Sequence, residues 1–242
     1  TLGLTKTELT MPAQINFGRY LLPLLVVRLN QHGAASLLRY AGVAFYLQSD
    51  GLLATCKHII ESIGPGETLV AKNLQTGAME MLLDIRVHAK ADFALCRTMA
   101  PTPHDYFRHL LTPVQLGAGV QALGFTAAGA DGKNLVVDAR LFKGYVSRLS
   151  QNASRPDAIS TLELSFPSLR GFSGAPVIGA QEQLIGMLFS NHESTIELFK
   201  YEEVDDEKSR YRESVHRVQE FGLVQPVADI RQFSAELGVA LQ

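Results

Sequence analysis

The sequence predicts an all-β fold in which two antiparallel β-barrels are followed by a C-terminal helix. Short apolar runs recur along the chain, turn-forming residues separate them, and the helix–strand alternation typical of parallel sheets is missing. The chain has 242 residues, of which 46% are hydrophobic. That length suffices for two small barrels that share one interface, so we take residues 1–242 as a single domain.

The first barrel is expected within residues 15–100. Asp50-Gly51 lies between two apolar runs and is a strong short-range signal for a hairpin. The expected strands are Leu21–Leu29, Gly42–Leu47, Leu52–Thr55, Thr68–Ala71, Met79–Val87 and Phe93–Leu95.

The second barrel is expected within residues 113–225, after a proline-containing linker that begins at Pro101. Ala130-Asp131-Gly132 marks a turn between two of its strands. The expected strands are Val120–Phe125, Leu135–Val146, Thr161–Leu164, Ala175–Ile178 and Leu184–Ser190.

Two stretches have helical spacing. After Pro226, apolar residues at 227, 230, 233 and 237 predict a C-terminal helix over residues 226–240. Within Asp205–Glu220, Tyr211, Val215 and Val218 mark a second apolar face, and the acidic start of this segment suits a helix N-terminus.

Composition argues against several kinds of partner. The net charge of −2 provides no field for nucleic acid or an anionic membrane, and no apolar run reaches the roughly 18 residues of a membrane span. Cys56 and Cys96 lack zinc-ligand spacing and are expected to be buried in strands. So few cysteines favour a reducing compartment, hence a cytoplasmic location, or a periplasmic one if a leader preceded Thr1.

Three residues have side chains suited to acyl transfer. His58 follows an apolar strand, where a general base can be held rigidly beside a cleft. Asp92 precedes an apolar strand, where a half-buried carboxylate can orient an imidazole. Ser173 lies in a glycine-rich segment, where the amides of Gly171 and Ser173 can converge on an oxyanion. Taken singly, each residue has an ordinary structural explanation as part of a strand end or a turn.

The order of the three residues along the chain is more informative. His58, Asp92 and Ser173 follow the order of the chymotrypsin triad. The first two lie in the first predicted barrel and the serine in the second, so they would meet in a cleft between the barrels. An esterase-type nucleophile elbow fits less well, because it requires a helix after the serine, whereas Pro176-Val177-Ile178 indicates a strand.

Six segments in register resemble the trypsin-like serine proteases, and most of all the HtrA/Deg-type bacterial protease domain. They are Gly42–Phe45 (Gly-x-Gly-Phe in the family), Ala54–Ile60 (Thr-x-x-His-Val-Val), Asp92–Leu95 (Asp-Leu-Ala-Leu), Gly119–Gly124 (Gly-x-x-Val-x-x-x-Gly), Gly144–Ser147 (Gly-x-Val-Ser), and Gly171–Val177 with Leu184–Gly186 (Gly-Asn-Ser-Gly-Gly-Pro…Val-Ile-Gly). The resemblance covers about residues 24–237.

The resemblance implies a chymotrypsin-like fold of two six-stranded barrels and a serine endopeptidase acting on protein or peptide substrates without metal or cofactor. His58, Asp92 and Ser173 would be its catalytic triad, and the backbone N–H groups of Gly171 and Ser173 its oxyanion hole. Phe172 departs from the family, which has Asp or Asn there, and excludes the activation route in which that carboxylate pairs with a new N-terminus. A catalytically weak or inactive binding module that needs a partner is therefore the alternative.

Substrate-binding residues are expected on both sides of the serine. By resemblance they are Phe166, Leu169, Arg170, Phe189, Ser190 and Asn191. Pro167 stands where trypsins have an aspartate, which favours a small or apolar substrate side chain, although His192 or Arg170 could favour an acidic one. Residues 192–221 form a longer segment than the connection that such proteases usually have before their last strand. This segment is either a partner-binding insertion that orders the pocket or a tolerated surface insertion.

Overall fold

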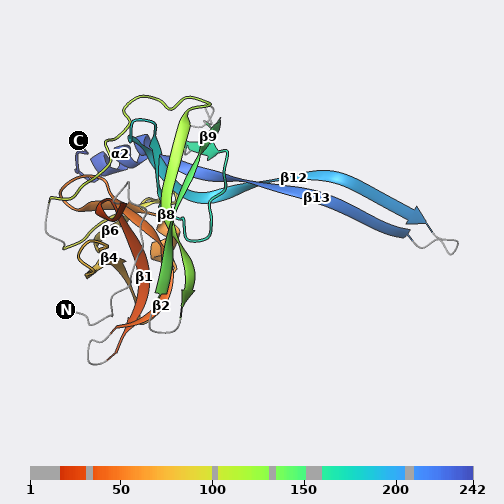
Figure 1. The fold of residues 1–242 in the computed structure, drawn as a ribbon. Helices are drawn as coiled ribbons and strands as arrows, with labels where there is room; N and C mark the ends of the chain where they lie inside the picture. Colours follow the sequence, from red (N-terminus) through yellow and green to blue (C-terminus); the bar gives the residue numbers. More distant parts are fainter. Residues whose placement is uncertain are drawn as a thin grey trace.

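The computed structural model describes residues 17–30, 35–99, 103–130, 135–150, 160–204 and 210–241. Antiparallel strands from the two halves of the chain form two separate sheets, and a two-stranded arm projects from the second sheet (Figure 1). A short helix closes the chain. The predicted all-β double barrel with a C-terminal helix is confirmed.

The first sheet has the strand order β5-β4-β1-β2-β3-β7-β6. Only Leu82 separates β5 from β6, yet these two strands lie at opposite edges of the sheet. The segment predicted as one strand over 79–87 therefore runs from one edge to the other and curls the sheet towards a barrel. Because this segment counts as two strands, the first sheet has seven strands and not the six expected. The strands are β1 (Leu21–Leu29), β2 (Ala35–Tyr46), β3 (Leu52–Thr55), β4 (Glu67–Lys72), β5 (Met79–Met81), β6 (Leu83–Val87) and β7 (Ala94–Arg97), with the short helices η1 (Phe17–Arg19) and α1 (Lys57–Glu61) beside them.

The second sheet is a closed barrel with the order β10-β13-β12-β11-β8-β9. Every expected strand of this half lies within, or overlaps with, an observed one. The turn expected at Ala130-Asp131-Gly132 lies largely outside the described residues. The strands are β8 (Gly119–Ala130), β9 (Leu135–Ser150), β10 (Thr161–Leu164), β11 (Pro176–Gly179), β12 (Leu184–Val204) and β13 (Arg210–Pro226).

One continuous apolar core joins the two barrels. Cys56 and Cys96 are fully buried in it as free thiols, as the sequence predicted, although Cys56 lies just after β3 and not within it. Burial raises the pKa of the Cys96 thiol to about 12, so it stays protonated. The largest fully buried side chains include Phe45, Leu53, Phe93, Leu123, Phe125 and Phe172.

The C-terminal helix α2 (Val227–Glu236) begins directly after Pro226 and buries Val227 and Ile230. Its Phe233 packs edge-on against Phe93 of the first half, with ring centroids 5.4 Å apart. The helix therefore ties the end of the chain back to the first barrel. Among the helices of the described residues, none is long and apolar enough to cross a membrane.

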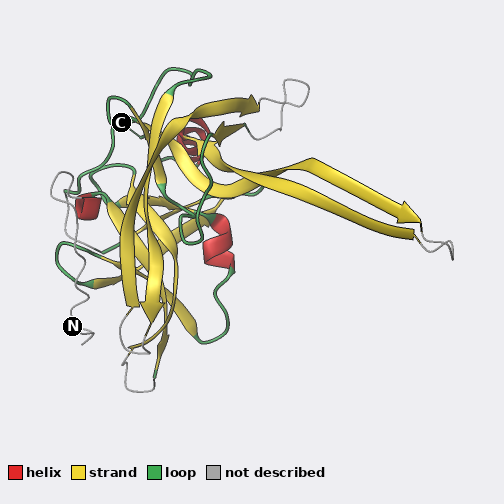
Figure 2. Cartoon of the chain, turned by 45° about the vertical axis from the view of Figure 1, so that its right-hand side comes forward, coloured by secondary structure: helices red, strands yellow, loops and turns green. Residues whose placement is uncertain are grey.

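The helix predicted within Asp205–Glu220 is wrong. Residues from Arg210 onwards belong to β13, which pairs with β12 along a ribbon that leaves the barrel (Figure 2). Tyr211 and Val215 are four residues apart, a spacing that places two side chains on one side of a helix and equally on one face of a strand. The pairing with β12 supplies the hydrogen bonds that decide between the two, and these depend on residues far away in the sequence.

Candidate active site

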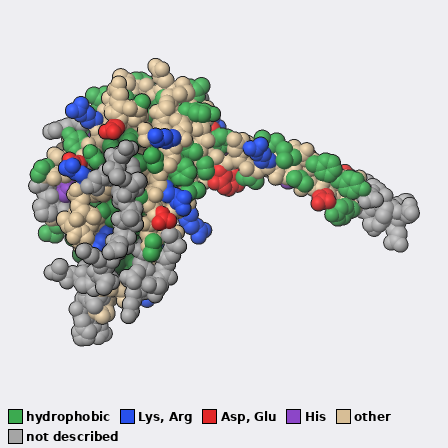
Figure 3. All heavy atoms as spheres, in the orientation of Figure 1, with side chains coloured by type: hydrophobic (Ala, Val, Ile, Leu, Met, Phe, Trp, Pro, Cys, Tyr) green, Lys and Arg blue, Asp and Glu red, His purple; other side chains and the backbone are tan. Residues whose placement is uncertain are grey.

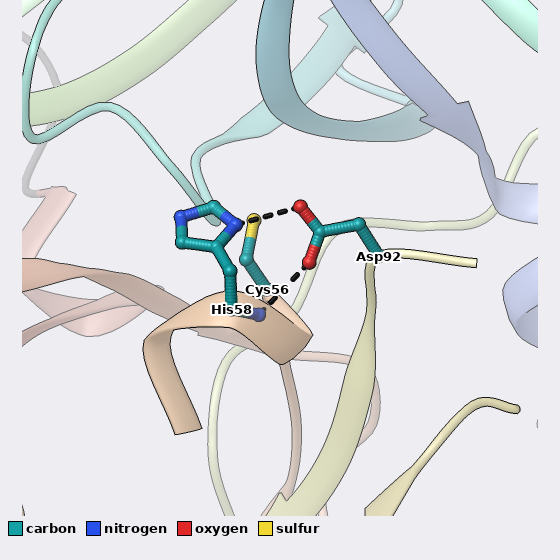
Figure 4. A group of neighbouring side chains, drawn as sticks. All are labelled: Cys56, His58 and Asp92. Atoms are coloured by element: carbon teal, nitrogen blue, oxygen red, sulfur yellow. Dashed lines mark hydrogen bonds and ion pairs between the residues drawn. The ribbon is translucent and has the colours of Figure 1, made fainter. Parts of the chain in front are cut away.

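His58 and Asp92 form the centre of the site. His58 is the second residue of α1, and its backbone N–H donates to Asp92 Oδ1 at 2.9 Å while its ring Nδ1 lies 2.6 Å from Asp92 Oδ2 (Figure 4). Partial burial acts to raise the Asp92 pKa, but the hydrogen bonds from His58 outweigh it, and the pKa lies below its ordinary value. The ionised carboxylate can only accept, so Nδ1 holds the proton and Nε2 is left as an acceptor.

Cys56 lies beside this pair, and its Sγ, a His58 ring nitrogen and an Asp92 oxygen are all within 4.8 Å of one another (Figure 4). Complete burial, with the charge of Asp92 added, raises the thiol pKa well above its ordinary value. The protonated thiol donates to the carbonyl of Leu188 at 3.6 Å. The thiol thus joins the segment before α1 to β12, beside the His58–Asp92 pair.

The segment before Ser173 forms a tight turn. The N–H of Phe172 donates to the carbonyl of Leu169 at 2.9 Å, and Gly171, the third residue of the turn, has φ +96°. Arg170, the second residue, is not among the residues with positive φ, so the turn is type II, which favours glycine at the third position. Within the described part of the chain, the amides of Gly171 and Ser173 have no acceptor.

Ser173 is held against the first barrel by its own backbone. Its carbonyl accepts a hydrogen bond of 2.9 Å from the N–H of Val43. The next residue, Gly174, has φ +87°, and a Cβ there would lie 2.0 Å from the carbonyl oxygen of Val43. Only glycine allows this approach, which brings a strand of one barrel and the serine turn of the other into direct contact.

Tyr40 of β2 supports the same turn from the first barrel. Its hydroxyl lies 2.9 Å from the carbonyl of Gly171 and 3.2 Å from that of Phe125, and its single proton is shared between these two acceptors. Burial raises the Tyr40 pKa, which keeps this donor protonated. Sequence reasoning missed Tyr40, because nothing in its neighbourhood along the chain indicates a contact with residue 171.

Phe172 explains how the turn holds without an acidic residue at this position. Its side chain is fully buried, and its ring meets that of Phe142 edge-on, with centroids 5.3 Å apart. Burying a side chain of this size contributes on the order of 2–3 kcal/mol. The turn is thus anchored in the core of the second barrel by apolar packing.

A cleft of about 450 Å³ lies between the barrels and is lined by residues of both. His58 and Asp92 form one side, Ser173 and the turn before it the other, and in the described residues no hydrogen bond joins the Ser173 hydroxyl to the His58 ring. This bond is often absent from ligand-free sites. The lining residues are His58, Asp92, Ser168, Leu169, Arg170, Ser173, Phe189, Ser190 and Asn191.

Most of the expected substrate-binding residues therefore reach the cleft, but Phe166 does not. Its ring is buried and stacks on Phe142, with centroids 5.7 Å apart, because this part of the chain directs residue 166 into the barrel. Of the two basic residues considered for an acidic substrate, Arg170 lines the cleft. His192 instead lies against Glu163, with Nδ1 3.2 Å from Oε2.

Asn191 bridges two walls of the cleft. Its Oδ1 accepts from the N–H of Ser168 at 2.5 Å, and its Nδ2 donates to the carbonyl of Ser168 at 2.8 Å and to Glu220 Oε2 at 3.0 Å. The amide thus ties residues 189–191 of β12 to the segment that leads to Ser173. Asn191 lines the cleft, so this fixed amide is part of the surface that a substrate would contact.

His88 holds the loop that presents Asp92. Its Nδ1 accepts from the N–H of Ala91 at 2.8 Å and from that of Lys90 at 3.2 Å, and its ring stacks on Phe93 and meets Phe233 edge-on. Burial, the largest cause, lowers the His88 pKa below 6.5. The folded protein therefore prefers the neutral ring, as both hydrogen bonds require.

This preference gives a pH dependence. Below pH 6.5 the unfolded chain binds a proton at His88 more readily than the folded one, so we expect the free energy of unfolding to be highest above pH 6.5 and to fall as the pH decreases through and below it. His109, whose pKa burial and Arg231 also lower, adds to the effect. In His88→Asn, an amide oxygen can replace Nδ1 without titrating, so denaturant unfolding between pH 4.5 and 8 should show a weaker decline. An equally steep decline in the variant would contradict this role.

The fold and the geometry of the cleft define the class of protein to which the chain belongs. A two-barrel fold with a histidine–aspartate pair and a serine turn facing one cleft is the arrangement of chymotrypsin-like peptidases. The family model of the trypsin-like peptidase domain matches residues 42–187, from β2, which contacts Ser173, to β12, which lines the cleft. The chain belongs to the trypsin-like peptidase family. No curated protein has a sequence that matches this chain.

Proposed function

We propose that the protein is a serine endopeptidase whose catalytic triad is His58, Asp92 and Ser173. The observation that carries this proposal is a pair of hydrogen bonds between His58 and Asp92, one from the backbone N–H and one from the ring. They lie at a cleft whose opposite wall contains Ser173. Family membership supports a peptidase-type function, and the position of the three side chains around one cleft supports the proposed residue roles.

In this mechanism Ser173 Oγ attacks the carbonyl carbon of the substrate peptide bond while His58 Nε2 accepts the hydroxyl proton. Asp92 stabilises the imidazolium that forms. The amides of Gly171 and Ser173 donate to the oxyanion, and such donors are each worth roughly 3–4 kcal/mol of transition-state stabilisation. His58 then gives its proton to the leaving amine, and a water molecule, activated in the same way, hydrolyses the acyl-enzyme.

A library of blocked peptides tests the proposal. Cleavage of internal bonds by the wild-type protein, with new termini identified by mass spectrometry, is the expected result, whereas removal of terminal residues alone would indicate an exopeptidase. No cleavage of any member by the folded protein would favour the alternative, a binding module that needs a partner for activation.

Asn191 is proposed as the residue that restricts the substrate side chain before the cleaved bond. Because its amide bridges to Ser168 across the cleft wall, we expect the wild type to prefer small side chains such as alanine. Asn191→Gly removes the bridge, and the ratio of kcat/KM for phenylalanine over alanine should rise by about 10-fold or more.

The comparison needs matched peptides that differ only at this residue, and Leu111→Ala as a control, since Leu111 is exposed and outside the cleft. An unchanged ratio in Asn191→Gly, or dominant wild-type cleavage after lysine or arginine, would contradict this role for Asn191.

A further inference from the structure

The arm formed by β12 and β13 has no covering layer among the described residues. The two strands stay paired from His192–Phe221 out to Val204–Arg210, far beyond the barrel (Figure 1). At about 3.3 Å per residue, the ribbon is roughly 40 Å long. A two-stranded ribbon is marginally stable in water when nothing packs on it. The arm is therefore expected to be stabilised by something that packs on it.

One face of the arm is apolar. The pairs Ile196–Arg217, Phe199–Val215 and Tyr201–Glu213 share this face, because paired residues point the same way and neighbouring pairs alternate. A bulge between Glu197 and Phe199 keeps Ile196 and Phe199 on one side. Green side chains follow the arm in Figure 3. The apolar face comprises Ile196, Phe199, Tyr201, Tyr211 and Val215, which are 41–59% exposed.

The other face of the arm is mostly polar, and its groups bond to one another. Arg212 lies 3.3 Å from Glu202, and the Ser214 hydroxyl lies 2.8 Å from the His216 ring. Such a face suits solvent. Val218, which pairs with Thr195, is also exposed on this face, but the larger group of apolar side chains lies on the apolar face.

The apolar face also carries two charged residues, and their positions along the arm favour a second copy of this chain as the partner that covers it. Arg217 lies towards the barrel, Glu213 lies towards the tip, and the Phe199–Val215 pair lies between them. A two-fold axis through that central pair would place Arg217 of one copy opposite Glu213 of a second copy, twice. A parallel arrangement would instead place like charges together. The face is thus complementary to itself in the antiparallel orientation.

The area is also adequate. Five apolar side chains of this size, about half exposed, present roughly 500 Å² on each arm, or about 1,000 Å² in a pair of arms. That is the lower limit for a specific interface between two proteins. The pair would therefore be a modest dimer whose population depends on protein concentration.

We propose that the apolar face of the arm is a dimer interface, on which the arm of a second copy of this chain packs antiparallel. This goes beyond the peptidase activity and does not rest on it. The arm directly follows Asn191, which lines the cleft and bridges to Ser168, so dimerisation would also steady this residue.

Charge reversal tests the proposal. Sedimentation velocity should show the wild type dimerising as its concentration rises to about 100 μM, a range that detects micromolar affinities. Arg217→Glu and Glu213→Arg should each weaken the dimer by at least about 10-fold, because each opposes like charges across the interface. An equimolar mixture of the two variants should form a heterodimer, since both of its cross-interface pairs are then complementary.

Lys200→Glu is the matched control, because it reverses a charge on the polar face, and it should dimerise like the wild type. Circular dichroism and the thermal unfolding midpoint of each variant establish that the barrels are folded. A wild type that stays monomeric over the whole range would overturn the proposal. So would charge variants that dimerise unchanged, or a mixture that does not restore association.

Discussion

Replacing Ser173 by alanine is expected to lower kcat/KM for peptide hydrolysis by about 10⁴-fold or more, since the attacking oxygen is lost. The substitution removes one partly exposed hydroxyl and no contact that holds the turn, because the turn depends on the buried Phe172 ring and on the Val43–Ser173 backbone bond. The unfolding midpoint should therefore stay close to that of the wild type. Progress curves with a cleavable peptide give the rate.

Binding separates the loss of chemistry from the loss of the site. Ser173→Ala should still bind the same peptide in a fluorescence titration, because the cleft walls are unchanged. Ser214→Ala, on the polar face of the arm, is the control for a serine outside the cleft and should retain full activity. Comparable activity in Ser173→Ala and the wild type would exclude Ser173 as the nucleophile.

Asp92→Asn is expected to lower kcat by about 10⁴-fold while the site keeps its shape. An amide at this position can present its NH₂ to the ring, so His58 Nδ1 would become the acceptor and the proton would move to Nε2. The ring then cannot take the proton of Ser173. Nitrogen-15 NMR of the histidine ring reports this change of tautomer directly, in addition to the rate.

Asp50→Asn is the matched control, since Asp50 also bonds to a cation, Arg97, and to a backbone N–H, but lies away from the cleft. It should leave kcat near the wild-type value. An Asp92→Asn protein with unchanged kcat and an unchanged tautomer would show that Asp92 does not orient the base.

The strands were predictable because each carries its signal locally. Leu21–Leu29, Leu52–Thr55 and Thr161–Leu164 are observed with their predicted bounds, since short apolar runs between turn residues need no distant information. The order of His58, Asp92 and Ser173 likewise indicated three residues that line one cleft, because the motif around each is local.

The arm was not predictable from the same signals. Tyr211 and Val215 fit a helix and a strand equally, and only the pairing with residues 199–203 decides between them. The contacts that complete the site are distant in the same way. Tyr40 meets Gly171, and Asn191 meets Ser168, across sequence separations that no periodicity records.

Mass spectrometry after treatment with a fluorophosphonate tests the central claim most directly, because this reagent reacts with a serine hydroxyl only when a base and an oxyanion site activate it. We predict a single adduct on the peptide that contains Ser173, which is absent from Ser173→Ala and much slower to form in His58→Ala. A folded wild-type protein that stays unlabelled, or that is labelled at another residue, would contradict the account.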